Sequence, residues 1–355
     1  MARFAATLAP LLLALATAPA VAQPTANEVQ PDRIPFGTVY AGAIVEGSFL
    51  VFEPGKDADV PFAVTAPKFI QVRHKATHVQ QFGAGNDFVC GTVEFALDTS
   101  APGDLSGEIS VTLGGAAVAV PVSATVKPPK QGQTRLLIVE TPFSRYSTGH
   151  GEDYKAWTDL VKDAPLDVNY LLVTSGKSVL RDLDLSKFDC VLLAEEGLAD
   201  LQEADTKRVR AFAEAGGRVV VAANAFFRGT VAKANAVLDG YGIEVRDEEA
   251  AGDGAEVTLP EGPIDPKLVK SGVHSAHFFR ASPVAVTDDK IGRVVVKALG
   301  VGMPGDGFVA LGAAGKGEVV ALGESLWWNW VAEKPAAGID NARLARWLLV
   351  APKGE

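Results

Sequence analysis

The sequence is poor in sulfur, with only two cysteines and two methionines among its 355 residues. The cysteines, Cys90 and Cys190, fall in separate segments of strand-like sequence. Two lone cysteines in different cores are more often small buried hydrophobic residues than partners in a disulfide. We therefore expect no disulfide.

Long apolar runs and basic clusters are also missing. Beyond the first 22 residues, no apolar run approaches the ~20 residues that span a bilayer. The formal net charge is −10, and no local group of Lys and Arg residues offsets it. An acidic chain repels nucleic acid and anionic membrane surfaces, so we expect no nucleic-acid partner and no membrane span.

The first 22 residues have the pattern of a secretory signal peptide. Arg3 gives a positive start, residues 8–16 are apolar, and Ala20-Val21-Ala22 is a small-residue cleavage pattern. Cleavage near Ala22 predicts an extracytoplasmic protein, either periplasmic or secreted, and no cysteine follows to accept a lipid.

The remaining chain divides at a short proline-rich linker. Residues 23–32 read as a flexible leader, and residues 33–127 are rich in strand-like runs separated by Gly and Pro. Two prolines and a glycine mark the linker at residues 128–133. In residues 134–355, strand-like and helix-like patterns alternate. This order predicts two domains.

The segment before the linker is predicted to be a β-sandwich, because its short strands recur regularly and residues 107–113 alternate apolar with polar side chains. Predicted strands are residues 44–53, 60–66, 69–75, 89–98, 107–113 and 117–126. The motifs at residues 35–39, 45–51 and 100–107 resemble immunoglobulin-like domains of the abnormal-spindle and hydin type. That resemblance implies a docking or spacing module without chemistry.

The segment after the linker is organised around Gly216-Gly217 and the strand that follows it. Residues 201–215 show helical spacing, and a glycine pair suits the positive φ of a helix C-terminus. Residues 135–139 and 189–194 are continuous apolar runs, which indicate strands covered on both faces. We predict an α/β three-layer, mostly parallel, flavodoxin-like sheet.

The series formed by residues 188–197, a helix, and residues 216–221 resembles the class I glutamine amidotransferase-like superfamily from Thr134 to the C-terminus. In catalytic members of that superfamily, the strand after the Gly-Gly pair delivers a cysteine nucleophile. Here it delivers Ala222-Ala223-Asn224-Ala225-Phe226-Phe227, which carries no thiol or hydroxyl. The resemblance therefore implies a non-catalytic member.

Later segments add further expectations. Residues 152–162 and 341–349 are predicted helices, the second with Asp340 as its N-cap, and residues 246–266 read as a surface loop. Residues 308–312 and 318–323 form a predicted β-hairpin. His274 and His277 lack further ligands at metal spacing, so no metal is expected. Gly315-Lys316-Gly317 lacks the Ser or Thr of a phosphate loop, and no cofactor is expected.

A ligand site in an open α/β sheet lies beyond the carboxyl ends of its strands. Applied here, that rule gathers carboxylates, a histidine, arginines, amides and aromatic rings into one candidate cleft, which would suit a polar small molecule or glycan. Its residues are Glu140, Arg145, His150, Glu195, Glu196, Asn224, Phe227, Arg228, Glu324, Trp328 and Asn329.

Three functions remain open. The favoured one is a non-catalytic binding or scaffold protein outside the cytoplasm, with a protein, polar small molecule or glycan as partner. The second is a hydrolase that uses Glu195 or Glu196 with His150 as acid and base. The third is an accessory subunit of an envelope transport or motility complex.

Overall fold

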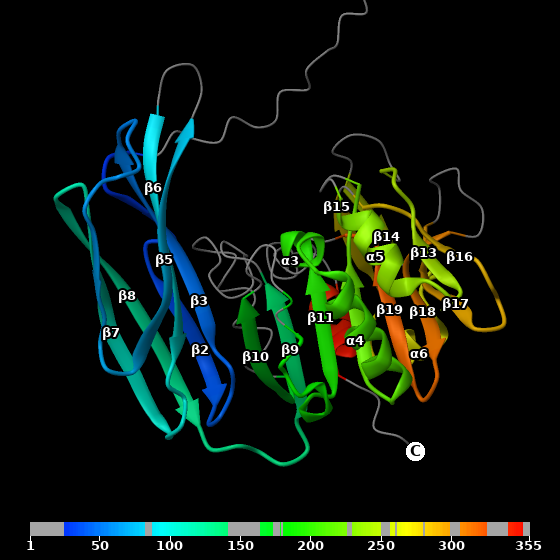
Figure 1. The fold of residues 1–355 in the computed structure, drawn as a ribbon. Coiled ribbons are helices and arrows are strands. Elements are labelled where there is room, and N and C mark those ends of the chain that lie inside the picture. Colours follow the sequence, from blue (N-terminus) through cyan, green and yellow to red (C-terminus); the bar gives the residue numbers. More distant parts are fainter. Residues whose placement is uncertain are drawn as a thin grey trace, which may run out of the picture.

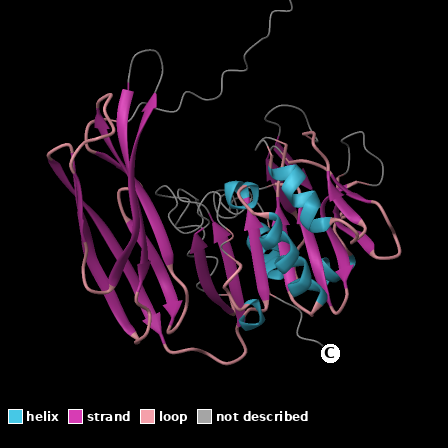
Figure 2. Cartoon of the chain, in the orientation of Figure 1, coloured by secondary structure: helices cyan, strands magenta, loops and turns pink. Residues whose placement is uncertain are grey.

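The computed structural model describes most of the chain from residue 25 onward. The described residues are 25–81, 87–140, 164–172, 178, 180–225, 229–249, 256–259, 261–279, 281–298, 306–324 and 340–350. Strands make up 49% and helices 16% of them, and Figure 2 shows how strongly strands dominate.

The first eight strands form two four-stranded sheets, which Figure 1 shows beside the rest of the molecule. One sheet has the order β1-β3-β6-β5 and the other β2-β8-β7-β4. All neighbours are antiparallel except β2 and β8, which are parallel. The strands are β1 (Glu28–Gln30), β2 (Ile34–Tyr40), β3 (Glu46–Pro54), β4 (Phe62–Thr65), β5 (Ile70–Gln81), β6 (Asp87–Leu97), β7 (Gly103–Leu113) and β8 (Ala116–Lys127).

A nine-stranded mixed sheet follows, with the order β10-β9-β11-β12-β19-β18-β16-β13 and with β17 paired to β18. The first five strands of that order run parallel, and the remaining pairs are antiparallel. Its strands are β9 (Thr134–Glu140), β10 (Leu166–Leu172), β11 (Cys190–Ala194), β12 (Arg218–Ala222), β13 (Ile243–Val245), β16 (Val284–Val286), β17 (Gly292–Lys297), β18 (Gly307–Ala314) and β19 (Gly317–Leu322). A separate antiparallel pair is β14 (Glu256–Leu259) with β15 (Ala276–Phe279).

A few helices of the described chain lie against the two faces of this sheet, too few to form full helical layers. Apolar side chains of α3 (Glu195–Ala199), α4 (Glu203–Glu214) and α5 (Thr230–Leu238) pack on one face, and those of α6 (Pro266–Lys270) and α8 (Asn341–Leu349) join the core on the other. In Figure 1, α4 and α5 lie in front of the strands and α8, in red, lies behind them. The 3-10 turn η1 (Leu185–Lys187) precedes β11.

Backbone conformation and close packing require glycine at both positions of the pair that follows α4. Gly216 has a φ of +122°, which favours glycine. A Cβ on Gly217 would lie 2.2 Å from the Phe212 ring. These residues allow the chain to leave α4 and enter β12, whose five residues are all buried.

The N-terminal sheets dock directly on edge strand β10. Val45 forms a parallel bridge with Tyr170, and Tyr170 N donates to Ile44 O at 2.8 Å. The Phe36 and Tyr170 rings lie 5.9 Å apart between centroids. One continuous apolar cluster therefore runs from the N-terminal sheets into the nine-stranded sheet.

The predicted arrangement of an immunoglobulin-like domain followed by a flavodoxin-like domain is wrong. The described chain is mostly β, and half of the pairs in the nine-stranded sheet are antiparallel, so the three-layer, mostly parallel description does not fit. The prediction extended the parallel character of residues 135–221 to the whole C-terminal segment. The later strands instead pair through the hairpin of β18 and β19 and through short antiparallel strands.

Several local expectations are confirmed. The hairpin at residues 308–323 is β18 and β19, and the last helix is α8 at Asn341–Leu349. Two other expectations are wrong. The expected flexible leader contains β1, and the expected surface loop contains β14. The predicted signal peptide and the predicted helix at residues 152–162 lie outside the described residues.

Candidate functional site

The carboxyl ends of four parallel strands meet at one edge of the nine-stranded sheet, which we call the carboxyl edge. β9, β11, β12 and β19 are consecutive neighbours, and Ala222 pairs with both Ala194 and Leu322. Glu140 ends β9, and Glu195 directly follows β11. The backbone thus brings these two residues to the same edge as Asn224 and Glu324.

Asn224 and Glu324 both lie two residues beyond a paired position and are only 2% and 1% exposed. The strand ends stay together past the last pair, because Ala223 N donates to Leu322 O at 3.0 Å. Thr230 Oγ1 donates to Asn224 O at 3.1 Å and fixes the turn toward α5. A buried amide and a buried carboxyl group at one edge are costly unless they are hydrogen-bonded, so they need a built polar environment.

Ser282 joins the two turns at the carboxyl edge. Its backbone N donates to Gly323 O at 2.7 Å, and its Oγ accepts from Ala225 N at 2.8 Å. Ser282 is fully buried. A Cβ on Gly323 would come within 2.0 Å of Ser282 O, so glycine is required for this close approach. Sequence reasoning missed Ser282, since a serine before a proline gives no signal of such a crossing.

Most other predicted site residues cannot be placed as side chains. Those outside the described residues are Arg145, His150, Phe227, Arg228, Trp328 and Asn329. For Glu140, Glu195 and Glu196 the structure gives the backbone position alone. The predicted cleft therefore remains a prediction, with Asn224 and Glu324 as its described side chains.

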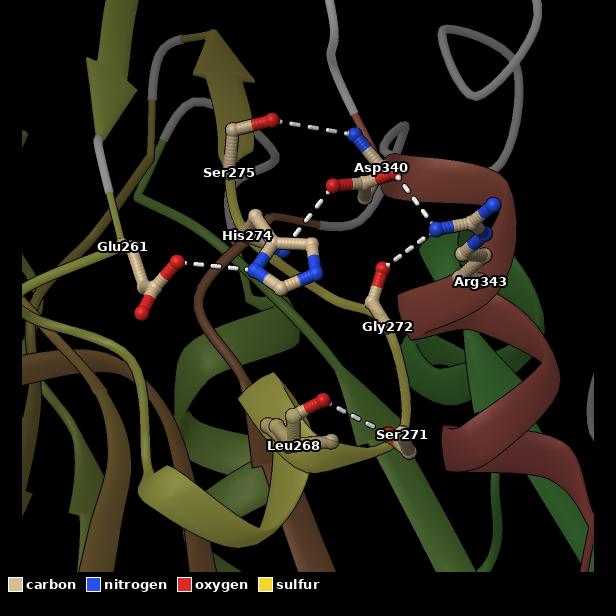
Figure 3. Close-up of polar contacts among 8 residues, drawn as sticks. All are labelled: Glu261, Leu268, Ser271, Gly272, His274, Ser275, Asp340 and Arg343. Carbon is tan, nitrogen blue, oxygen red and sulfur yellow. Dashed lines mark hydrogen bonds and ion pairs between the residues drawn. The ribbon is translucent and has the colours of Figure 1, made fainter.

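The two histidines of the His-x-x-His pattern have different roles. The His274 ring is exposed, and its Nδ1 lies 2.8 Å from Glu261 Oε2 (Figure 3). His277 is buried in β15. Its backbone N donates to Asn341 Oδ1, and its O accepts from Asn341 Nδ2, both at 2.9 Å. Among the described residues, no group of three His, Cys, Asp or Glu side chains could hold a metal ion.

Asp340 is the N-cap residue of α8, as predicted, although its side chain makes no capping hydrogen bond. Its Oδ2 accepts from the backbone N of His274 at 2.8 Å, and its own N donates to Ser275 Oγ at 3.2 Å (Figure 3). Arg343 Nη1 donates to Gly272 O at 2.7 Å. Because these contacts tie the helix start to residues 272–275 through backbone groups, they are structural.

Neither cysteine is placed for nucleophilic chemistry. Both are fully buried within strands, and burial raises the pKa of each thiol to about 12. A thiol with such a pKa is almost entirely protonated at neutral pH, and the thiolate is the nucleophile. The described chain therefore offers no reactive cysteine.

The chain belongs to the family described as "Domain of unknown function (DUF4350)", which matches residues 123–349. No curated protein matches the sequence. No helix in the described part of the chain is long and apolar enough to cross a membrane.

Similar solved structures are distant. One is an exo-β-1,4-mannosidase from Opitutaceae bacterium strain TAV5, with 13% identity, 63% of this chain and 37% of that chain covered, and a TM-score of 0.39. Two are cytoplasmic proteins of Salmonella typhimurium, both 12% identical. One match covers 70% of this chain and 97% of that chain with a TM-score of 0.35, and the other covers 61% and 97% with a TM-score of 0.37. This chain thus spans little more than a third of the mannosidase.

These findings correct two expectations from the sequence. The matched family is described as a domain of unknown function rather than as an immunoglobulin-like or amidotransferase-like one, and its match begins inside β8, across the expected linker. The expected extracytoplasmic location is not borne out either. Two of the similar structures are described as cytoplasmic proteins.

Proposed function

We propose that this chain is a non-catalytic binding protein that takes a polar ligand at the carboxyl edge. The observation that carries the proposal is the convergence of four adjacent parallel strands on Glu140, Glu195, Asn224 and Glu324. Strand ends of this kind are where open sheets of parallel strands place ligand-binding groups.

The chemistry of this edge favours binding over turnover. The turn after β12 carries Asn224, whose side chain supplies an amide. Ser282 Oγ is buried and already accepts the Ala225 N–H, so it is poorly placed to attack a substrate. Amide and carboxylate groups suit the hydroxyls of a glycan or another polar small molecule.

The test is calorimetric titration of the full chain with a panel of neutral mono- and disaccharides. Glu324→Gln keeps the shape of the side chain but removes its charge, and we expect it to weaken binding at least tenfold. Glu318→Gln is the matched control, because it makes the same change at the opposite end of β19. It should bind like the wild type even though it is less stable.

Turnover is measured in the same samples by following release of reducing sugar. Binding without release supports the proposal. Release that is lost in Glu324→Gln would establish a hydrolase instead, and a panel that fails to bind to the wild-type chain would refute the glycan assignment.

A further inference from the structure

A second site lies at the opposite edge of the nine-stranded sheet, where the N-terminal sheets meet it. A pocket of about 300 Å³ opens there between the turn at residues 41–44, the starts of β9 and β10, and residues 183–188. This volume is at the lower end of the range for small-molecule sites. We call it the junction pocket, and it shares no residue with the carboxyl edge.

The walls of the junction pocket are fixed before any ligand arrives. Asn169, which is 6% exposed, accepts from Ile44 N at 2.9 Å through its Oδ1. Its Nδ2 donates to Leu136 O and to Asp167 O, both at 3.3 Å. One amide therefore holds the turn of the N-terminal sheets against β10, so the pocket needs little ordering on binding.

The positive charge of Arg135 is already used within the protein. Its Nε and Nη2 donate to the two carboxylate oxygens of Asp189 at 3.2 and 3.0 Å. The backbone N of Arg135 donates to Asp189 at 2.8 Å as well. Because the Arg135 guanidinium is engaged in this bidentate ion pair with Asp189, it only weakly compensates the negative charge of a second carboxylate nearby.

That other carboxylate is Asp167, which pairs with Arg135 in the register of β10 and β9 and lines the pocket. Its Oδ1 is shut away from water and has no hydrogen-bond partner among the described residues. Burial raises the pKa of Asp167, while Arg135 lowers it and Asp189 raises it further. An under-compensated carboxylate at a pocket wall is stabilised by a cation that enters the pocket.

The remaining charged groups at the pocket complete the pattern. Asp184 is occupied, because its Oδ1 accepts from Ser186 N and Ser186 Oγ at 3.2 and 2.6 Å. Lys187 is exposed on the wall formed by residues 183–188. The pocket thus offers an anionic group at Asp167 and a cationic group at Lys187.

We propose that the junction pocket binds a small zwitterion, whose protonated amino group pairs with Asp167 and whose carboxylate faces Lys187. The amino group carries the larger share of binding, because Asp167 is the less exposed of the two protein groups. This site is independent of the function proposed for the carboxyl edge.

The experiment uses the full chain at pH 7 and four probes of similar size: β-alanine, ethanolamine, propionate and 1,2-propanediol. Binding is measured by calorimetry and by the shift in Tm. We expect β-alanine to bind most tightly, ethanolamine more weakly, and propionate and the diol not at all. Asp167→Asn should weaken both amines at least tenfold, and Lys187→Ala should weaken β-alanine alone.

Two controls keep the result interpretable. Asp167→Asn removes a destabilising buried charge, so its Tm without ligand should equal or exceed that of the wild type. Asp182→Asn changes a fully exposed aspartate nearby and should bind like the wild type. The proposal is overturned if propionate binds as well as the amines, if Asp167→Asn binds them normally, or if no amine binds at 10 mM.

Discussion

Arg218 at the start of β12 forms an ion pair with Glu318 on β19 and reaches the end of α8 as well. Its Nε donates to Glu318 Oε1 at 2.6 Å. Its Nη1 donates to the carbonyl oxygens of Trp347, Leu348 and Val350 at 2.5, 3.1 and 2.8 Å. One nearly buried guanidinium thus joins two strands to the C-terminus of a helix, where a cation is favourable.

Arg218→Ala should destabilise the chain by about 3–5 kcal/mol, because it leaves Glu318 and the three carbonyl oxygens at the end of α8 without their donor. The measurement is urea unfolding followed by circular dichroism. Arg135→Ala is the control, because the ion pair between Arg135 and Asp189 is much more exposed. This variant should lose less than about 1 kcal/mol of stability. Equal losses in both variants would contradict this account.

Gly323→Ala should destabilise the carboxyl edge by about 1–3 kcal/mol, because the new methyl group would collide with the Ser282 carbonyl. Gly262→Ala is matched to it, since a methyl group there has no heavy atom within 4 Å. That control should stay within about 0.5 kcal/mol of the wild type. Thermal unfolding of both variants is the measurement. An unchanged Tm for Gly323→Ala would show that the backbones of Gly323 and Ser282 can move apart at little cost.

Both cysteines should be unreactive in the native protein. At pH 8, burial and a pKa of about 12 leave too little accessible thiolate for Ellman's reagent. We expect no labelling within minutes in buffer and two thiols per chain in 6 M guanidinium chloride, which matches the two cysteines of the sequence. Rapid labelling of the folded chain would place a thiol at the surface, against the burial described above.

The junction between the N-terminal sheets and β10 should respond to pH through Glu46. Burial raises its pKa above the ordinary 4.5, although the Leu172 N–H and Arg73 act in the opposite direction. A raised pKa in the folded state means that the folded chain binds this proton more tightly. Ionisation of the buried Glu46 therefore costs no folding stability below pH 4.5. The loss of stability grows as the pH rises through the raised pKa and is complete above it.

Glu46→Gln should accordingly be more stable than the wild type at pH 7 and indistinguishable from it near pH 4. The amide oxygen of Gln can still accept the Leu172 N–H, which Glu46 Oε2 accepts at 3.0 Å. Unfolding free energies at pH 4, 5.5 and 7 test the sign. A variant that is less stable at pH 7 would show that the charge itself stabilises the junction.

The sequence predicted local structure better than architecture. The alternation at residues 107–113 and the continuous apolar run of β12 depend on immediate neighbours, so both strands could be found. The strand β16 has only three residues, too few for any periodicity to show. It pairs antiparallel with β13 and with β18, and no local pattern reports such distant partners.

At the candidate sites too, the sequence revealed residues that follow from local patterns but not residues whose surroundings come from distant segments. Asn224 and Glu324 could be proposed because each follows an apolar strand, and parallel strands share an edge. Ser282 and Asp167 could not, since their surroundings are set by segments far away in sequence. Asn169 is the clearest case, because its partner Ile44 lies 125 positions earlier.

The docking of β10 against Val45 and Phe36 has a practical consequence for work on this family. A shortened gene product limited to residues 123–349 would retain Tyr170 but lose the aromatic ring and the bridge that cover it. Such a fragment would expose to solvent an apolar surface that the intact chain buries, so we expect it to aggregate or to fold poorly. We therefore expect that a stably folded, soluble fragment must include the N-terminal sheets, which precede the matched residues 123–349.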